Sequence, residues 1–198
     1  PDETAHFLRA AAVARGQLVP DPTAAGPGGT LPSSLVELTA GPWGALRGRP
    51  EASITVREVT SRLTHRPRVE AEVIVPFPES SRWSPVATLP QSLALLLARA
   101  LGLPPLVHYL LGRLAGLAAW TALVWLSLRV APGCRWTLAL LSLTPMSLFL
   151  AGSHSPDVMT NALALLLVAL ALRSTASLDP LGGREAAFLL STAGLLML

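Results

Sequence analysis

Long apolar stretches in the second half of the chain predict membrane-spanning helices. A helix needs about 20 predominantly apolar residues to cross the hydrocarbon core of a bilayer. The stretch at 105–130 meets this length on its own. Pro145 lies inside the second stretch, at 136–152, and is expected to kink it. The four predicted spans are 105–130, 136–152, 157–173 and a fourth that begins at 186 and runs to the end of the chain at 198.

The first 90 residues carry a mixed pattern that predicts an exposed segment. Pro1-Asp2-Glu3 is a standard start of a helix, and a modest apolar face follows it. A helix is therefore predicted over 1–16. Residues 20–50 are rich in Pro and Gly and predict an irregular loop. Residues 53–59 and 69–75 alternate polar with β-branched residues, which predicts two strands, with a hairpin as one way of pairing them.

These patterns together predict an all-α polytopic membrane protein, in which a transmembrane helix bundle follows an extracytoplasmic first loop with a short helix and a β-hairpin. The run at 89–103 is too short to span the bilayer, so an interfacial helix is expected there. The chain starts with Pro and stops inside an apolar run, so we expect a fragment of a longer protein. The predicted parts are a juxtamembrane helix at 1–16, an extracytoplasmic loop at 17–88, the interfacial helix at 89–103 and transmembrane helices over 104–198.

Composition agrees with a membrane protein and locates its charge. Hydrophobic residues make up 51% of the 198 residues and charged residues 14%, against about 25% charged in soluble domains. Residues 1–90 hold nine Arg and nine acids, so the net charge of +3 arises in the second half, which holds six Arg and three acids. All fifteen basic residues are Arg, yet they form no face that would follow phosphates, so no nucleic-acid partner is expected. The single cysteine, Cys134, excludes an intrachain disulfide.

The arginines of the short connections predict the orientation of the spans. Arg129 and Arg135 flank one connection and Arg173 and Arg184 another, whereas residues 153–157 carry no basic residue. The positive-inside rule therefore places the first two connections in the cytoplasm and residues 153–157 outside the inner membrane. By alternation residues 1–90 also lie outside, because loops longer than about 60 residues cross largely regardless of their charge.

The acids of the outer face are the first candidates for chemistry. On a helix, Asp2 and Glu3 lie four and three residues before His6, so the histidine can meet either carboxylate. Such a group can act as a general base, or as a carboxylate–imidazole site for a divalent cation, which is the one cofactor suggested. The alternative is that the acids only complement the dipole of a helix N-terminus.

A second candidate group lies at the start of the third predicted span. Ser155-Pro156-Asp157 has the residues that begin a helix, and capping alone is one explanation. The other is functional, because Asp157 is an ionisable residue at a membrane interface, with His154 and Asn161 close by in sequence.

Arg113 is the third candidate, because it lies about 12 Å into the first predicted span at 1.5 Å per residue. A charge at this depth is tolerated if it faces a polar cavity and meets an anion such as a phosphate. His108 lies about one turn nearer the outer interface. The alternative is that Arg113 pairs with an acid of a helix outside this chain.

Several short motifs occur in an order that resembles a bacterial family of multi-pass membrane proteins, filed as domain of unknown function 2142. The resemblance spans nearly the whole chain, although no residues at 20–80 anchor it. The matching residues are Pro1-Asp2-Glu3-Thr4-Ala5-His6-Phe7, then Pro85 with Leu89-Pro90-Gln91, Leu111-Gly112-Arg113, Leu143-Thr144-Pro145-Met146-Ser147-Leu148-Phe149, and Ser153-His154-Ser155-Pro156-Asp157 with Asn161-Ala162-Leu163.

That family looks like a member of the membrane glycosyltransferase superfamily known as GT-C. The superfamily places an acidic motif directly after the first transmembrane helix and takes sugar from a polyprenyl-phosphate donor. The resemblance thus implies that Asp2 or Glu3 is the catalytic acidic residue, Asp157 a second carboxylate, and Arg113 a ligand of the donor phosphate. The implied partners are membrane lipids and a lipid-linked sugar, which is transferred to a cell-envelope acceptor on the outer face.

Two other functions stay open at this point, so the sequence does not decide whether the chain is an enzyme. A transporter or flippase of an envelope lipid or polymer would use Arg113 and Asp157 to line its path. A non-catalytic scaffold for envelope assembly would use the acids only to start helices. In the glycosyltransferase interpretation, His108 binds the donor phosphate together with Arg113, while His6 and Asp157 orient the base or hold the cation, supported by His154, Ser155 and Asn161.

Overall fold

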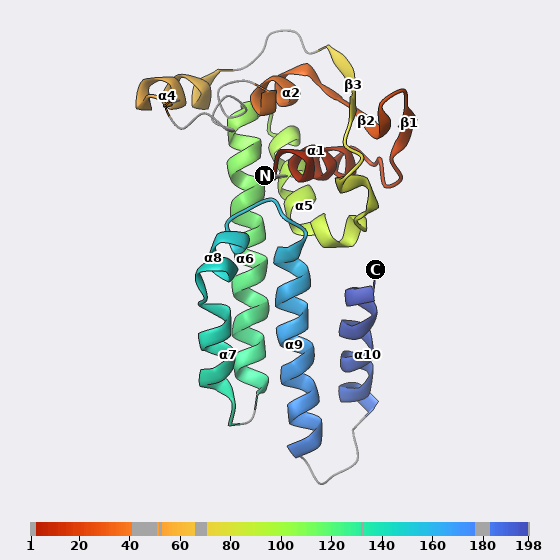
Figure 1. The fold of residues 1–198 in the computed structure, drawn as a ribbon, viewed down its shortest axis with the longest axis vertical. Helices are drawn as coiled ribbons and strands as arrows, with labels where there is room; N and C mark the ends of the chain where they lie inside the picture. Colours follow the sequence, from red (N-terminus) through yellow and green to blue (C-terminus); the bar gives the residue numbers. More distant parts are fainter. Residues whose placement is uncertain are drawn as a thin grey trace. The chain divides into compact units, whose positions relative to one another are not determined.

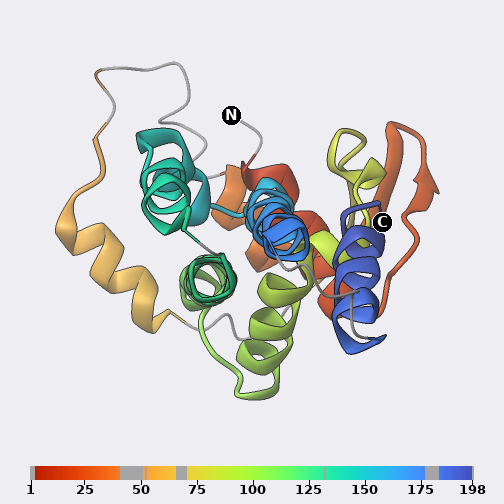
Figure 2. The same ribbon diagram turned by 90° about the horizontal axis from the view of Figure 1, so that it is seen from below.

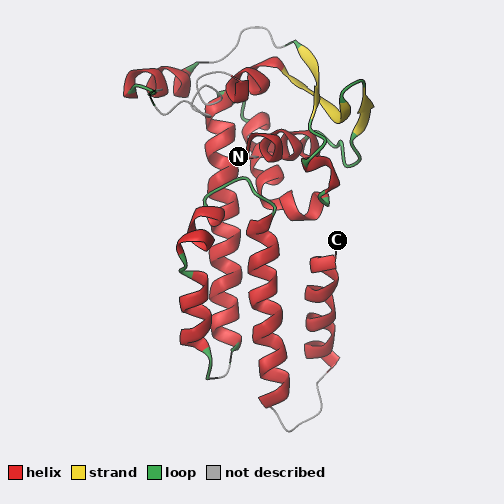
Figure 3. Cartoon of the chain, viewed as in Figure 1, coloured by secondary structure: helices red, strands yellow, loops and turns green. Residues whose placement is uncertain are grey.

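The computed structural model describes residues 3–40, 51, 53–65, 71–131, 133–176 and 183–197. Most of these residues are helical, and one small sheet accompanies the helices (Figure 3). The chain divides into two compact units, Pro1–Ala115 and Gly116–Leu198, and each contains a hydrophobic core. Figure 1 labels the helices and strands of the chain.

Unit 1 is built around α1 (Glu3–Ala14), which lies within the range 1–16 that the sequence predicts as a helix. Residues 7–13 are all buried, and because they make nearly two turns, this part of α1 is covered on every side. The alanines at 10–12 carry little side-chain bulk, so neighbouring backbones can approach closely. The core joins Phe7 and these alanines to Leu31, Leu35, Phe77 and Leu95 from other elements.

The sheet has the antiparallel order β1-β2-β3, formed by β1 (Asp21–Thr23), β2 (Gly26–Pro32) and β3 (Glu72–Pro76). The predicted irregular loop at 20–50 is therefore wrong over 21–40, where a helix at Ser33–Ala40 follows the two strands, and 41–50 lie outside the described residues. A two-residue turn joins β1 to β2, and Thr23 Oγ1 closes it by donating to the carbonyl of Gly26 at 2.6 Å. β3 confirms part of the strand expected at 69–75, whereas 66–70 lie outside the described residues.

The strand predicted at 53–59 is wrong, because this segment forms α4 (Val56–Thr64). Thr55 caps the helix, and its hydroxyl accepts from the Glu58 backbone N–H at 3.3 Å. Glu58 also lies 3.7 Å from Arg62, one turn later. The T-x-x-E sequence is a capping-box signal, and it outweighs the β-branched residues that suggested a strand.

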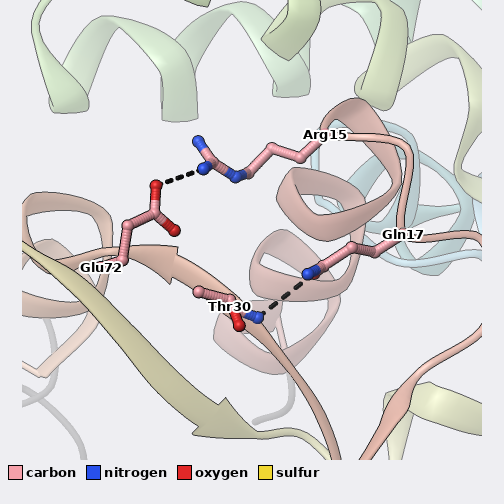
Figure 4. A network of polar contacts seen from close by, with 4 residues as sticks. All are labelled: Arg15, Gln17, Thr30 and Glu72. Atoms are coloured by element: carbon pink, nitrogen blue, oxygen red, sulfur yellow. Dashed lines mark hydrogen bonds and ion pairs between the residues drawn. The ribbon is translucent and has the colours of Figure 1, made fainter.

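Polar contacts fasten the C-terminal end of α1 to the sheet. The fully buried Arg9 donates to the backbone oxygens of Gln17 and Leu18, at 3.0 and 2.7 Å, and its burial lowers the pKa of the guanidinium. Figure 4 shows the neighbouring contacts, in which the Gln17 side chain accepts from Thr30 N at 3.2 Å and Arg15 pairs with Glu72. The turn after α1 is thereby held by Arg9 from within the helix, and the residues that follow the helix contact the sheet.

The rest of unit 1 is helical. α5 packs against α1, and it is shorter than the predicted interfacial helix because the chain turns at Gly102, which has a φ of +59°. α6 has the bounds that the apolar pattern predicts for the first span. The elements are α2 (Ser33–Ala40), η1 (Ser80–Arg82), η2 (Pro85–Thr88), α5 (Leu89–Ala100) and α6 (Pro105–Val130).

The span predicted at 136–152 is divided into two short helices, α7 (Arg135–Ser142) and α8 (Pro145–Ala151). Thr144 has extended backbone angles, which a following proline favours, so Pro145 begins a new helix instead of kinking one. Hydroxyl groups satisfy a carbonyl that the break exposes. Thr144 Oγ1 and Ser147 Oγ donate to the Leu141 oxygen at 3.1 and 3.2 Å.

α9 (Asp157–Ala176) is the centre of unit 2, and α10 (Gly183–Met197) lies beside it (Figure 2). Small residues of α9 pack against its neighbours, Ala162 with Trp120 and Ala151, and Ala169 with Leu138. Within the described part of the chain, two helices are long and apolar enough to cross a membrane, at 105–130 and 157–175. α10 contains a shorter apolar stretch, Ala186–Leu195.

Candidate functional site

Glu3 and Arg113 meet within unit 1, although 110 positions separate them in the sequence. Glu3 lies in the first turn of α1 and Arg113 in the third turn of α6, and Glu3 Oε1 is 3.5 Å from Arg113 Nε. The partner of Arg113 is therefore an acid of this chain, where the sequence left open an acid of another helix. Both side chains are partly exposed, so the pair contributes at most about 1 kcal/mol to stability and acts mainly by positioning.

Tyr109 supports this pair, and the sequence reasoning missed it. It lies one turn before Arg113 on the same face of α6, with its ring centroid 5.8 Å from the guanidinium carbon. The centroids of the Tyr109 and Phe7 rings are 5.2 Å apart in a T-shaped arrangement. This aromatic contact links α1 to α6 beside the ion pair. The available signal was its spacing, because the single tyrosine of the chain stands four residues before Arg113.

The rest of the acidic motif lies around this pair. Asp2 falls outside the described residues, and it directly precedes Glu3 in the chain. His6 lies one turn after Glu3 on α1, and its ring centroid is 6.5 Å from that of Trp83, edge to face. Glu3, Tyr109 and Arg113, with the adjoining His6, are called the α1–α6 site below.

His108 does not join the α1–α6 site. Its Nδ1 is 3.1 Å from the Pro104 carbonyl, and five residues of helix put it about 140° around the axis of α6 from Arg113. It instead lines a pocket of about 300 Å³ together with Arg15 and Arg99. Arg15 follows the C-terminal end of α1, whereas Glu3 lies at the other end, about 18 Å away along the helix axis at 1.5 Å per residue. His108 and Arg113 therefore lie on different sides of α6, and a role of His108 at the donor phosphate stays a prediction.

The second candidate group lies in unit 2 and begins α9. The Ser155 hydroxyl accepts from the Asp157 backbone N–H at 3.2 Å and donates to Asp157 Oδ2 at 3.0 Å. This is the geometry of a helix cap, as one of the two sequence interpretations proposed. His154 is fully buried, whereas Asn161 is exposed on α9.

A metal site would need several of these side chains to converge. In the part of the chain that the structure describes, no three His, Cys, Asp or Glu side chains are grouped so that they hold a metal ion. Because Asp2 lies outside that part, the cation site predicted from Asp2, Glu3, His6 and Asp157 stays a prediction.

The α1–α6 site can bind an anion beside a carboxylate. Arg113 is an always-charged group that is 41% exposed, so a phosphate can approach it, and the acids at the start of α1 can accept a proton. Comparison with protein families gives one match, described as "Predicted membrane protein (DUF2142)", over residues 1–198. Comparison with curated proteins and with solved structures gives no match.

Proposed function

Because this chain belongs to the DUF2142 family of predicted membrane proteins, we propose that it acts at a membrane, as a glycosyltransferase-like protein of the GT-C type. It transfers sugar from a polyprenyl-phosphate donor to a cell-envelope acceptor on the outer face of the bacterial inner membrane. The observation that carries the proposal is the contact of Glu3, from the acidic motif of α1, with Arg113 of the apolar helix α6. This contact supports the proposal because it brings the acidic motif next to the arginine that would bind the donor phosphate.

The packing of α6 supports a location at the bilayer interface. Leu106 is buried and Tyr109 half-buried within unit 1, so protein packs against one side of the first two turns of α6, whereas Leu110 is exposed. The helix after Arg113 still has the 17 residues at 114–130, at the lower end of the range of about 17–25 that cross a bilayer. We therefore place Arg113 near the level of lipid headgroups, where a lipid phosphate lies.

In the proposed reaction, a carboxylate of Asp2 or Glu3 takes the proton of the acceptor hydroxyl. The acceptor oxygen forms a bond to the anomeric carbon of the sugar, and the bond from that carbon to the phosphate oxygen breaks. Arg113 stabilises the negative charge that develops on the departing polyprenyl phosphate. Glu3 is engaged with Arg113, which favours Asp2 as the base and Glu3 as a positioning residue.

The remaining parts of the proposal concern residues around this reaction. His6 orients the base from the next turn of α1. Asp157, with Ser155, His154 and Asn161 nearby in sequence, belongs to a second outer loop at 153–157 and supplies a further carboxylate. Residues 1–90 lie on the outer side together with this loop, as the arginine distribution predicts.

The break between α7 and α8 favours a second candidate function, which is transport of an envelope lipid or polymer. Transporters commonly use helices that are interrupted within the membrane, with the freed backbone groups satisfied locally. Here, hydroxyl groups of Thr144 and Ser147 bond to the Leu141 carbonyl at the break.

The two functions differ in the fate of a lipid-linked sugar. We expect the full-length protein in lipid vesicles, given polyprenyl-phosphate sugar labelled in the sugar and a cell-envelope fraction as acceptor, to move the label to the acceptor and release polyprenyl phosphate. Vesicles without the protein are the control. If intact labelled donor crosses to the other leaflet without release of polyprenyl phosphate, the protein is a transporter and the transferase proposal is wrong. If the donor neither reacts nor crosses, both proposals are wrong.

A further inference from the structure

α5 has an inverted distribution of polar and apolar side chains. Its exposed side is made of leucines, while the side packed against the rest of unit 1 includes Gln91 and Ser92. The exposed leucines are between 45% and 60% exposed and are called the leucine face. They are Leu89, Leu93, Leu96, Leu97 and Leu101.

The leucine face is continuous. Its members stand at positions i, i+4, i+7, i+8 and i+12, so they follow one side of a helix with 3.6 residues per turn. Arg99 is the single charged residue within α5; it is exposed and stands three residues after Leu96, so it borders the leucine face, and it lines the pocket with Leu95. No other charged side chain of α5 adjoins the leucine face.

The buried side of α5 carries polar side chains at its start, followed by Leu95 and Ala98. Gln91 is 0% exposed, and neither its Oε1 nor its Nε2 has a hydrogen-bond partner among the described residues. The buried Ser92 Oγ also has no partner within that part of the chain. A helix that buries amide and hydroxyl groups and exposes leucines has the opposite pattern from a helix at a water-exposed surface.

The elements next to α5 indicate that the bilayer covers the leucine face. Four residues, Leu101–Pro104, separate α5 from α6, and they reach at most about 14 Å when fully extended. Since α6 is long and apolar enough to span a membrane, α5 is held next to the surface at which that span begins. The leucine face therefore lies within a short stretch of chain from a helix that can cross the bilayer.

We propose that α5 lies along the membrane interface with its leucine face among the acyl chains, as a second lipid contact beside α6. The ligand class is the hydrocarbon part of any bilayer lipid, because the face offers no polar group that would select a headgroup. This inference does not depend on the transferase proposal, since it concerns a different side of unit 1 and a physical contact that requires no reaction.

The test uses nitroxide labels on two leucines that are equally exposed in the structure. Leu97 is 57% exposed on the leucine face, and Leu18 is 58% exposed after α1, outside α5. Leu97→Cys and Leu18→Cys are each made in the full-length protein with Cys134→Ser, labelled, and placed in phosphatidylcholine nanodiscs. Electron paramagnetic resonance then compares collisions with oxygen, which concentrates in lipid, and with a water-soluble nickel chelate.

We expect the ratio of oxygen to nickel collisions to be at least fivefold higher for the label at Leu97 than for the label at Leu18. A label at Leu93, on the same face, is expected to match Leu97. Equal ratios at Leu97 and Leu18 would overturn the proposal, because the leucine face would then lie in water. A label at Leu97 that is shielded from both reagents would overturn it as well, because protein would then cover the face.

Discussion

Replacing Asp2 by Asn in the full-length protein is expected to lower the rate of sugar transfer by about 10²–10⁴-fold, which is the usual contribution of a general base. The amide has nearly the shape of the carboxylate but cannot accept the proton of the acceptor hydroxyl. The effect should appear in kcat, because donor binding rests mainly on Arg113. The rate of transfer from a polyprenyl-phosphate sugar in lipid vesicles, measured at several donor concentrations, gives both kcat and the KM for the donor.

Glu3→Gln provides the contrasting result for the same site. The pair of Glu3 with Arg113 orients the guanidinium, so we expect this variant to raise the KM for the donor more than it lowers kcat. Glu79→Gln, at an exposed acid, is the matched control and should transfer at the wild-type rate. If Asp2→Asn and Asp157→Asn both leave transfer unchanged, the carboxylates have no catalytic role.

Gly28→Ala is expected to have the largest effect on folding. A Cβ at this position would lie 2.3 Å from the Val75 carbonyl oxygen and 2.9 Å from Pro76 Cα. Both are backbone atoms of β3, so they can withdraw only if β2 and β3 separate. We expect a loss of about 3 kcal/mol in the free energy of unfolding, or more, because overpacking of a tight site costs this much.

A loss of this size should lower the melting temperature of the detergent-solubilised protein by about 6–12 °C. Gly194→Ala is the control, because a Cβ there meets no atom within 4 Å in the described part of the chain. A melting temperature of Gly28→Ala equal to that of the control would mean that β2 and β3 are not paired in this register.

The sequence predicts best those elements that long apolar runs define. α6 follows the run at 105–130 residue for residue, and α9 begins at the predicted Asp157. The sequence does not predict β1 and β2, because Gly and Pro in β2 indicate a loop, whereas Gly28 is required there by the close approach of β3. The β-branched alternation at 53–59 predicts a strand, whereas the cap at Thr55 begins the helix α4 in the structure.

The sequence identifies Glu3, His6 and Arg113 as separate candidates, but it predicts neither Tyr109 nor the arrangement of the four residues. The pattern of acids at a helix start suggested Glu3, and charge in an apolar run suggested Arg113. Their contact depends on how α1 packs across unit 1, and a pairing over 110 positions leaves no periodic signal in a single sequence. The sequence predicts a kink at Pro145, whereas the structure has a full break at Thr144, where one helix ends and the next begins.

The proposed orientation puts residues 1–90, with Glu3, on the outer side of the membrane and the connection between α6 and α7 on the cytoplasmic side. Cys134 is exposed in that connection and serves as a natural reporter. The measurement is labelling of intact cells with a membrane-impermeant maleimide, for full-length protein whose single cysteine is either Cys134 or Leu18→Cys. We predict that Leu18→Cys reacts in intact cells and that Cys134 reacts only after the membrane is permeabilised. Reaction of Cys134 in intact cells, with Leu18→Cys protected, would contradict the account.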